Sequence, residues 1–415
     1  MQPKMENMQI TVVAPKQIGG TILLPASKSI SNRALTINAL SGNTKLPHNI
    51  SDCDDTRVMT QWLREQPSTV DIGAAGTAMR FSTALLAVAD GTHIITGTER
   101  MKNRPIGVLV DALRQLGANI EYTEKDGFPP LRITGNRNLT GGRISLQGNI
   151  SSQYISALLM IGPVLKNGLQ LQLTGGIVSR PYIDMTLSIM RDFGAEAQWT
   201  SEDTIAVKPT GYEKKDYSVE NDWSAASYWY EIMALTQDKN VSVTLPNLFA
   251  NSLQGDNKGV ALFDLLGVET VYQQGEVILR KSNVKVERLD HDFVEIPDLA
   301  QTFVVTCCML GIPFHFTGLQ SLKIKETDRI SALKNELGKL GFIIEDRNDS
   351  ELLWDGNRTA PKADAAIDTY EDHRMAMAFA PAAITLGSIK INDPHVVSKS
   401  YPNYWEDLKK AGFSL

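Results

Sequence analysis

Five segments of the chain share one pattern, in which an amphipathic helix ends at a glycine and the chain continues as a strand. They read DALRQLGANIEY, IMRDFGAEAQW, LFDLLGVETVY, ELGKLGFIIED and DLKKAGFSL. The glycines, spaced 77, 73, 74 and 71 residues apart, are Gly117, Gly194, Gly267, Gly341 and Gly412. Glycine readily takes the left-handed backbone that ends many helices. The nearly equal spacing indicates a long internal repeat.

A β-hairpin is expected after each of the first four glycines. In ANIEYTEKDGFPPLRITG, for example, an alternating strand turns at a polar segment and returns. The fifth copy stops at Leu415, which leaves no room for a return strand. The opening segment MQITVVAP alternates in the same way, and we expect it to supply the missing strand.

A second helix precedes each copy and one more lies near residue 28; each begins in small and polar residues and continues as an apolar run. The six starts are SKSISNRALTINAL, GAAGTAMRFSTALLAV, SSQYISALLMIGPVL, DWSAASYWYEIMAL, IPDLAQTFVVTCCML and YEDHRMAMAFAPAAITL. A chain of 415 residues has room for two or three domains. We therefore predict six α/β units in two domains of three, one at residues 20–219 and the other built from 1–19 plus 220–415.

Composition excludes several classes of protein. With 42% apolar residues, and with no apolar run of membrane-spanning length, the chain is typical of a soluble protein. The start MQPKMENMQI lacks the apolar core of a secretory signal, so we expect a cytoplasmic protein. Cys53, Cys307 and Cys308 form neither a disulfide framework nor a spaced metal cluster. The formal charge of −6 argues against nucleic acid as the main partner.

Basic residues cluster at three predicted helix starts in the first half. Lys28 and Arg33 flank Ser29 in SKSISNR, where free N–H groups and the helix dipole favour an anion. Gly76 in GAAGTAMR lets the backbone approach a ligand closely, and Arg104 lies in the basic segment TERMKNRPIG. The alternatives are that Ser29 is an N-cap, that the glycines serve packing and that the basic segment is a solvated loop.

Hydroxyl groups gather at two further helix starts. Ser151, Ser152 and Gln153 form SSQ, while Ser179 and Tyr182 lie in SRPYID. Their hydrogen-bond donors suit the acceptor oxygens of a phosphate, although serines are also common helix caps.

The second half supplies carboxylates beside its cations. KETDR is expected to place Lys325, Glu326 and Arg329 within one helical turn, either around an anion or with a routine Glu326–Arg329 ion pair. Asp298 opens an apolar helix, where it could be a cap. Arg374 in DHR and Lys399 in SKSYP complete the set.

The order of these motifs resembles one known family. SKSISNR, GTAMR, ERMKNRPIG, SSQ, SRPYID, IPD, KETDR, DHRMAM and SKSYP follow one another as in the 5-enolpyruvylshikimate-3-phosphate synthases. The resemblance implies an α/β fold of two similar domains, each of three βαβαββ units. This is the inverse α/β barrel of enolpyruvyl transferases, with the active site in the interdomain cleft. It also implies transfer of the enolpyruvyl group of phosphoenolpyruvate to the 5-hydroxyl of shikimate 3-phosphate, with release of phosphate and without a metal or cofactor.

The resemblance also assigns residues. Domain 20–219 would bind mainly shikimate 3-phosphate, and the other domain would carry the acid/base carboxylates and the arginines for the phosphoenolpyruvate carboxylate. The catalytic set is Asp298, Glu326 and Lys28. The shikimate 3-phosphate set is Ser29, Arg33, Ser151, Ser152, Gln153, Ser179, Tyr182, Asp298, Ser321 and Lys325. The phosphoenolpyruvate set is Lys28, Gly76, Arg104, Gln153, Arg329, Arg374 and Lys399. We expect a monomer that glyphosate inhibits.

Two departures and two alternatives accompany this hypothesis. Ala74 and Ser321 stand where the family commonly has asparagines, which predicts altered affinity rather than lost activity. The first alternative is UDP-N-acetylglucosamine enolpyruvyl transferase, which normally carries a catalytic cysteine in the segment that corresponds to residues 97–106, where this chain has none. The second is a non-catalytic binding paralogue, against which the complete set of charged residues argues.

Overall fold

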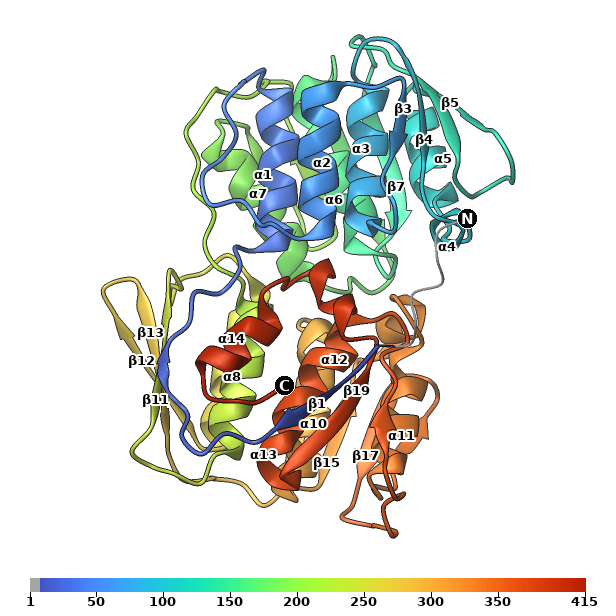
Figure 1. The fold of residues 1–415 in the computed structure, drawn as a ribbon. Helices are drawn as coiled ribbons and strands as arrows, with labels where there is room; N and C mark the ends of the chain where they lie inside the picture. The colour runs from blue at the N-terminus through green and yellow to red at the C-terminus, as the bar shows by residue number, and fades with distance from the viewer. Residues whose placement is uncertain (1–7) are drawn as a thin grey trace. The chain divides into compact units, whose positions relative to one another are not determined.

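The computed structural model describes residues 8–415, which divide into two compact units (Figure 1). The N-terminal unit is Ala26–Glu220, and the C-terminal unit joins the chain up to Pro25 to Asn221–Leu415. The expected division at residue 20 differs because strand β2 (Gly20–Thr21) pairs in parallel with β11 (Ser242–Pro246), which ties it to the C-terminal unit. Residues 1–7 of the expected domain lie outside the described part.

The five predicted glycine-terminated helices are all present. Each glycine has a positive φ, between 84° at Gly194 and 103° at Gly412. A side chain at Gly341 would also place its Cβ 2.5 Å from the carbonyl oxygen of Thr359, so conformation and space both require glycine there. The helices are α5 (Gly107–Gln115), α7 (Arg180–Asp192), α9 (Gly259–Leu265), α11 (Arg329–Lys339) and α14 (Tyr404–Lys410).

The N-terminal unit contains two four-stranded sheets of the same topology. Their strand orders are β3-β4-β6-β5 and β7-β8-β10-β9, and in each the first pair is parallel and the others are antiparallel. The last two strands along the chain form the predicted hairpin. The strands are β3 (Thr69–Asp71), β4 (Thr92–Thr96), β5 (Asn119–Tyr122), β6 (Leu131–Thr134), β7 (Gly142–Gln147), β8 (Leu169–Thr174), β9 (Ala197–Trp199) and β10 (Thr204–Val207).

The first repeat along this unit, which contains α1 (Lys28–Leu40) and α2 (Asp54–Glu65), has no sheet in the described part of the chain. The segment between these two helices makes only an isolated parallel bridge, from His48 to Ser218, among the described residues. The linking sequence SGNTKLPHNIS is rich in residues that disfavour strands, and Pro47 has no N–H to donate to a ladder.

The C-terminal unit contains three sheets, and the opening strand completes one of them. β1 (Gln9–Val13) pairs antiparallel with β19 (Ser388–Asn392), and Val13 also bridges to Ser414, so the expected return strand is confirmed (Figure 1). The sheet orders are β1-β19-β18, β12-β13-β11-β2 and β14-β15-β17-β16. The remaining strands are β12 (Val268–Gln273), β13 (Glu276–Lys281), β14 (Leu289–Asp292), β15 (Phe314–Thr317), β16 (Glu345–Arg347), β17 (Glu351–Trp354) and β18 (Ala366–Ile367).

Three buried helices pack together at the centre of each unit, and they are the six predicted second helices. In the N-terminal unit they are α1, α3 (Gly76–Ala87) and α6 (Ser152–Ile161). In the C-terminal unit they are α8 (Trp223–Leu235), α10 (Ala300–Leu310) and α12 (His373–Phe379). Every residue of α3 is buried, and so is every residue of α8 except the half-buried Ser224, as expected for largely apolar helices in a core. Within residues 8–415 we find no helix with the length and apolar character needed to cross a membrane.

Helix α8 buries one carboxyl group in this core. Glu231 is 0% exposed, and neither of its carboxyl oxygens has a hydrogen-bond partner among the described residues. The hydroxyl of nearby Thr306 donates to the carbonyl of Thr302 at 2.7 Å. Burial raises the pKa of Glu231 well above its ordinary value, so the folded chain keeps a proton that the unfolded chain loses near pH 4–5.

We expect stability to fall with rising pH because of this group. Since the folded state binds the extra proton, the free energy of unfolding should decrease above the unfolded pKa, by at most about 1.4 kcal/mol per pH unit. Glu231→Gln removes the titration, so its melting temperature should rise relative to the natural chain between pH 5 and pH 8. Exposed Glu269→Gln is the control. A difference in melting temperature between Glu231→Gln and the natural chain that stays the same at all pH values would contradict this expectation.

Candidate active site

Three predicted motifs of the N-terminal unit, SKSISNR, GAAGTAMR and SSQ, lie at the starts of its central helices. Lys28 is the first residue of α1, and the N-cap is Ser27, whose hydroxyl accepts from the N–H of Ile30 at 3.4 Å. The alternative of Ser29 as the cap is therefore wrong. Ser29 lies one residue into the helix, beside Lys28, as an anion-binding role requires.

Arg33 is a buried cation held by neutral acceptors. Its guanidinium donates to the hydroxyls of Thr186 and Ser156, at 2.7 and 3.0 Å, and to the carbonyl of Ser29 at 2.9 Å. The ring of Tyr182 lies 5.9 Å from its carbon Cζ. Burial lowers the pKa of Arg33 to about 10, and the nearby Tyr182 only partly opposes this shift. The positive charge is thus desolvated, and no carboxylate within residues 8–415 lies at ion-pair distance to balance it.

Two further arginines meet over the first residue of α3. A Cβ on Gly76 would lie 2.6 Å from a terminal nitrogen of Arg104 and 2.7 Å from one of Arg80. Arg80 is 5% exposed and donates to the carbonyl of Gly76 at 2.8 Å. Burial lowers the pKa of Arg80, and the adjacent charge of Arg104 lowers it further. Two neighbouring guanidinium groups repel unless an anion joins them.

The first turn of α3 also binds a carboxylate that the sequence analysis missed. Asp55, in the first turn of α2, accepts a hydrogen bond from the N–H of Thr77 at 3.0 Å. The Thr77 hydroxyl in turn accepts from the carboxamide of Gln153 at 3.1 Å. Asp55 and Thr77 are 22 positions apart, and only an acidic pair at a helix start could have suggested this role. The network holds Gln153 against the start of α3.

The two serine-rich starts differ in their capping. Ser151 is the N-cap of α6, and its hydroxyl accepts from the N–H of Gln153 at 3.4 Å, so the cap interpretation is correct for it. Ser152 is the first helical residue. Ser179 precedes α7 with a left-handed φ of 54° and makes no side-chain cap, so strained backbone presents its hydroxyl at the helix start.

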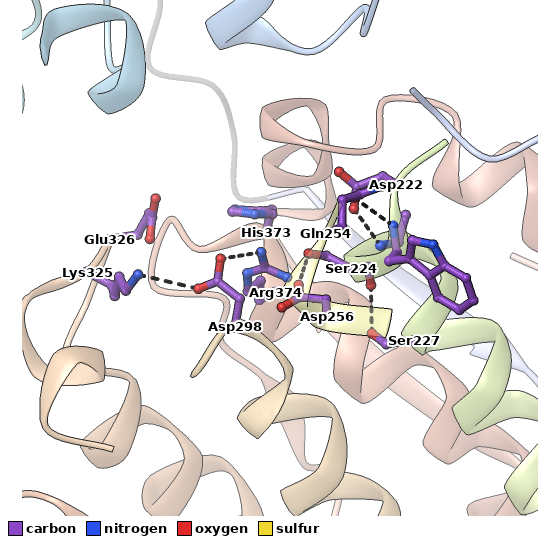
Figure 2. A network of polar contacts seen from close by, with 12 residues as sticks. Asp222, Ser224, Ser227, Gln254, Asp256, Asp298, Lys325, Glu326, His373 and Arg374 are labelled. Carbon is purple, nitrogen blue, oxygen red and sulfur yellow. Dashed lines mark hydrogen bonds and ion pairs between the residues drawn. The ribbon is translucent and has the colours of Figure 1, made fainter. Parts of the chain in front are cut away.

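In the C-terminal unit Asp298 is the centre of a charged network (Figure 2). Its carboxylate accepts from Arg374 at 2.8 Å and from Arg329 at 3.2 Å, and lies 3.5 Å from the ammonium of Lys325. Helix α10 begins at Ala300 with Leu299 as its N-cap residue, so Asp298 is not the N-cap. Three cations therefore converge on this carboxylate, two from the KETDR motif and one from α12.

Arg329 is buried among three carboxylates. Its guanidinium donates to Asp372 at 2.7 Å, to Glu326 at 2.8 Å and to Asp298 at 3.2 Å, and its side chain is only 1% exposed. Burial alone would lower the pKa of Arg329, but the carboxylates of Asp372, Glu326 and Asp298 outweigh burial and raise it. The predicted Glu326–Arg329 pair exists, although it is buried rather than a surface pair.

The sequence predicted that the KETDR motif forms one helical turn, and this prediction is wrong. Helix α11 begins at Arg329 after the cap residue Asp328, and Lys325 instead follows a short 3₁₀ segment, Gln320–Ile324, which contains Ser321. Asp328 caps the helix by accepting from the N–H of Ser331 at 3.1 Å, which forces the preceding residues out of helical geometry. Lys325 and Arg329 are brought together by Asp298.

Lys399 and Arg374 complete the predicted set. Lys399 lies 3.7 Å from the carboxylate of Glu326, so that carboxylate contacts two cations. Arg374 follows the cap of α12, Asp372, which accepts from its N–H at 2.9 Å. Asp372 thus orients Arg329 and begins α12, a double role that DHR in the sequence did not reveal.

Behind Arg374 lie three residues that sequence reasoning also missed. The Tyr228 hydroxyl accepts from Arg374 at 3.4 Å. Asp256 accepts a short hydrogen bond from Ser224 (Figure 2). The second oxygen of Asp256 is buried without a hydrogen-bond partner among residues 8–415. Burial and the nearby Asp298 raise the pKa of Asp256 to about 7.

The cations of the two units therefore differ in whether they contact carboxylates. Among the described residues, no carboxylate lies within ion-pair distance of the three arginines of the N-terminal unit discussed above, whereas Lys325, Arg329, Arg374 and Lys399 all contact carboxylates. The N-terminal set is thus suited to bind anions directly. The C-terminal set places two carboxylates, Asp298 and Glu326, among cations, as acid–base chemistry on an anionic substrate requires.

Known proteins of similar sequence share one description. The family model for EPSP synthase (3-phosphoshikimate 1-carboxyvinyltransferase) matches residues 65–408. A 3-phosphoshikimate 1-carboxyvinyltransferase of Bacteroides fragilis is 62% identical over 408 residues, covering 98% of this chain and 99% of its own length. The corresponding protein of Vibrio atlanticus is 36% identical, covering 96% of this chain and 98% of its own length.

A solved structure supports the fold. The EPSP synthase of Acinetobacter baumannii superimposes with a TM-score of 0.76 at 20% sequence identity, covering 99% of this chain and all of that chain. At 20% identity the structural similarity supports only the fold, whereas the sequence matches show the family relationship. Together they agree with the two-domain enolpyruvyl transferase fold expected from the motifs. The chain belongs to the EPSP synthase (3-phosphoshikimate 1-carboxyvinyltransferase) family.

Proposed function

We propose that the side chains described above carry out the reaction of this family in the roles expected from the motifs. The reaction transfers the enolpyruvyl group of phosphoenolpyruvate to the 5-hydroxyl of shikimate 3-phosphate and releases phosphate. It is a step of aromatic amino-acid synthesis. The observation that carries the assignment of roles is a contrast between the units. Arg33, Arg80 and Arg104 of one unit have no carboxylate within ion-pair distance among the described residues, whereas the other unit sets carboxylates among its cations.

The N-terminal unit supplies phosphate and carboxylate contacts in this proposal. Ser29 and Arg33 bind the carboxylate side of shikimate 3-phosphate, and Ser151, Ser152 and Ser179 bind its phosphate, with Gln153 and Tyr182 beside the ring. Lys28, Gly76 and Arg104 bind the phosphate end of phosphoenolpyruvate. Support comes from the buried charge of Arg33 and from the adjacent Arg80 and Arg104 guanidinium groups, each of which gains from an incoming anion.

The C-terminal unit supplies the acid–base groups. Phosphoenolpyruvate becomes electrophilic at C2 when C3 takes a proton, and the 5-hydroxyl attacks C2 as it loses its own proton. A tetrahedral ketal forms, and it then expels phosphate while C3 gives up a proton. We assign Asp298 as the base near the hydroxyl and Glu326 as the proton donor to C3, with Lys28 assisting. Lys325 and Ser321 contact shikimate 3-phosphate.

The cations of this unit must exchange partners during binding. Arg329 and Arg374, assigned to the phosphoenolpyruvate carboxylate, already contact Asp298, and Arg329 and Lys399 contact Glu326. A substrate carboxylate that takes over part of these contacts would release both protein carboxylates for proton transfer. Substrate binding and activation of the acid and base would then be one event.

A phosphate-release assay tests the assignment. Phosphoenolpyruvate should release phosphate with shikimate 3-phosphate as the acceptor and not with UDP-N-acetylglucosamine. Turnover with the sugar nucleotide alone would overturn the function, and no turnover with either acceptor would favour a binding paralogue. The proposal further includes a monomeric, cytoplasmic enzyme that glyphosate inhibits in competition with phosphoenolpyruvate.

Gly76→Ala should weaken phosphoenolpyruvate binding. Its Cβ would lie 2.6 Å from Arg104 and 2.7 Å from Arg80, so the Arg104 guanidinium, at the end of a flexible side chain, must move away from the bound phosphate. We expect the KM for phosphoenolpyruvate to rise about tenfold, as for the loss of one charge-assisted contact, and glyphosate inhibition to weaken more.

Gly338→Ala is the matched control. It lies within α11, and a Cβ there would meet no atom within 4 Å, so it should leave both constants unchanged. An unchanged KM in Gly76→Ala would mean that Arg104 does not bind this substrate.

A further inference from the structure

Tyr154 connects the start of α6 to the segment that carries Arg104. It follows Gln153, is 7% exposed and belongs to the first turn of the helix. Its hydroxyl donates a hydrogen bond of 2.6 Å to the carbonyl oxygen of Pro105, the residue after Arg104. The following residue, Pro105, also restricts the backbone conformation of Arg104. The Tyr154 hydroxyl therefore anchors the backbone directly beside the Arg104 side chain.

The ring of Tyr154 contacts a second guanidinium of the same group. Arg80 lies with its carbon Cζ 5.7 Å from the ring centroid, a distance at which the negative ring face stabilises a cation. The other end of that guanidinium donates to the carbonyl of Gly76 and lies next to Arg104. One aromatic side chain thus holds both arginines, the first through its ring and the second through the backbone.

We propose that Tyr154 is a positioning residue that aligns Arg104 with Arg80 over Gly76 to receive the phosphate of phosphoenolpyruvate. This inference rests on the proposed function and extends it to a residue that would otherwise count as an apolar position of a core helix. Without the hydroxyl contact, repulsion between the two guanidinium groups is free to move the Arg104 segment outward. Alignment is therefore maintained before any anion arrives.

Tyr154 also shares its helical turn with residues assigned to the other substrate. Ser152 and Gln153 precede it directly, so a phosphate held at the start of α6 and an arginine held by Tyr154 are connected through one rigid turn. Tighter phosphoenolpyruvate binding in the presence of shikimate 3-phosphate should therefore depend partly on Tyr154.

Tyr154→Phe tests the proposal because it removes only the hydroxyl and keeps the ring. We expect the KM for phosphoenolpyruvate to rise about five- to tenfold, as for a lost hydrogen bond that orders a charged group. The turnover number and the dissociation constant for shikimate 3-phosphate should stay within about twofold. Calorimetric titration of phosphoenolpyruvate into the enzyme without shikimate 3-phosphate, where no acceptor is present and no turnover occurs, should show the same loss.

Tyr212→Phe is the matched control. The Tyr212 hydroxyl donates to the carbonyl of Met160 at 2.7 Å, at the other end of α6, so this variant also removes a tyrosine-to-backbone hydrogen bond from the same helix. We expect it to lower the melting temperature about as much as Tyr154→Phe but to leave the KM for phosphoenolpyruvate unchanged.

A double variant shows whether the effect passes through Arg104. Adding Tyr154→Phe to Arg104→Ala should weaken phosphoenolpyruvate no further, since the residue being positioned is already gone. A KM within twofold of the natural value in Tyr154→Phe, an equal loss for both substrates, or a full additional loss in the Arg104→Ala background would overturn the proposal. Absence of phosphate release by the natural chain would instead overturn the function itself.

Discussion

Asp298→Asn should lower turnover by about 100-fold or more, the usual cost of losing a positioned acid or base. The amide keeps the shape of the carboxylate but cannot take a proton from the 5-hydroxyl. Binding should respond in the opposite way, because Asp298 competes with the substrate carboxylate for Arg329 and Arg374. The dissociation constant of phosphoenolpyruvate should therefore stay the same or fall. Single-turnover kinetics and calorimetry measure the two effects separately.

The control for this variant is Asp264→Asn. Asp264 forms an exposed ion pair of 2.6 Å with Lys285 in the same unit, so the same chemical change away from the site should alter neither quantity. Near-normal turnover in Asp298→Asn would reduce Asp298 to a counter-ion. Weaker phosphoenolpyruvate binding would show that its contacts with the arginines hold them in place and do not compete with the substrate.

Arg329→Met should lower the free energy of unfolding by about 3–5 kcal/mol, since it leaves the buried Asp372 and the partly buried Glu326 and Asp298 without their common cation. Asp372 is 0% exposed, so water cannot replace the lost partner. The deficit should shrink as pH falls, because protonation removes the charge that has become uncompensated. Calorimetric melting between pH 5 and pH 8 measures both effects.

Arg288→Met is the matched substitution at the surface. Arg288 pairs with Asp290 and Asp355 at 2.8 Å each, but its side chain is 41% exposed, so we expect a loss below about 1 kcal/mol. Equal losses at Arg288 and Arg329 would mean that the buried network contributes no more to stability than an exposed one.

The repeat architecture was predictable because its signals are local. A helix ending at Gly341 or Gly412 needs only the helical period and a residue that tolerates positive φ, both of which are written in adjacent residues. The missing return strand of the last repeat was also predictable, since the opening segment MQITVVAP reads as a strand that could supply it. Local strand signals could not fix the division between units, because β2 pairs with β11 across more than 200 residues.

The candidate site was predictable in its membership and less so in its connections. Motif order identified Arg33, Arg104, Asp298 and Arg329. The structure places Arg104, Asp298 and Arg329 at the start of a helix or just before one, and Arg33 in the second turn of α1. The expectation that KETDR forms one helical turn was wrong, because the Asp328 cap starts the helix later than charge spacing suggested.

The sequence by itself determined the family, the helix and strand pattern and the identity of the charged residues. Tertiary structure alone decided which charges meet: that Asp298 balances Lys325 and Arg374, that Asp55 occupies the start of α3, and that Tyr154 anchors the Arg104 segment. The physical reason is distance along the chain. Dihedral preferences and helix periods act over a few residues, whereas these partners lie 22 to 76 positions apart and meet only when helices pack.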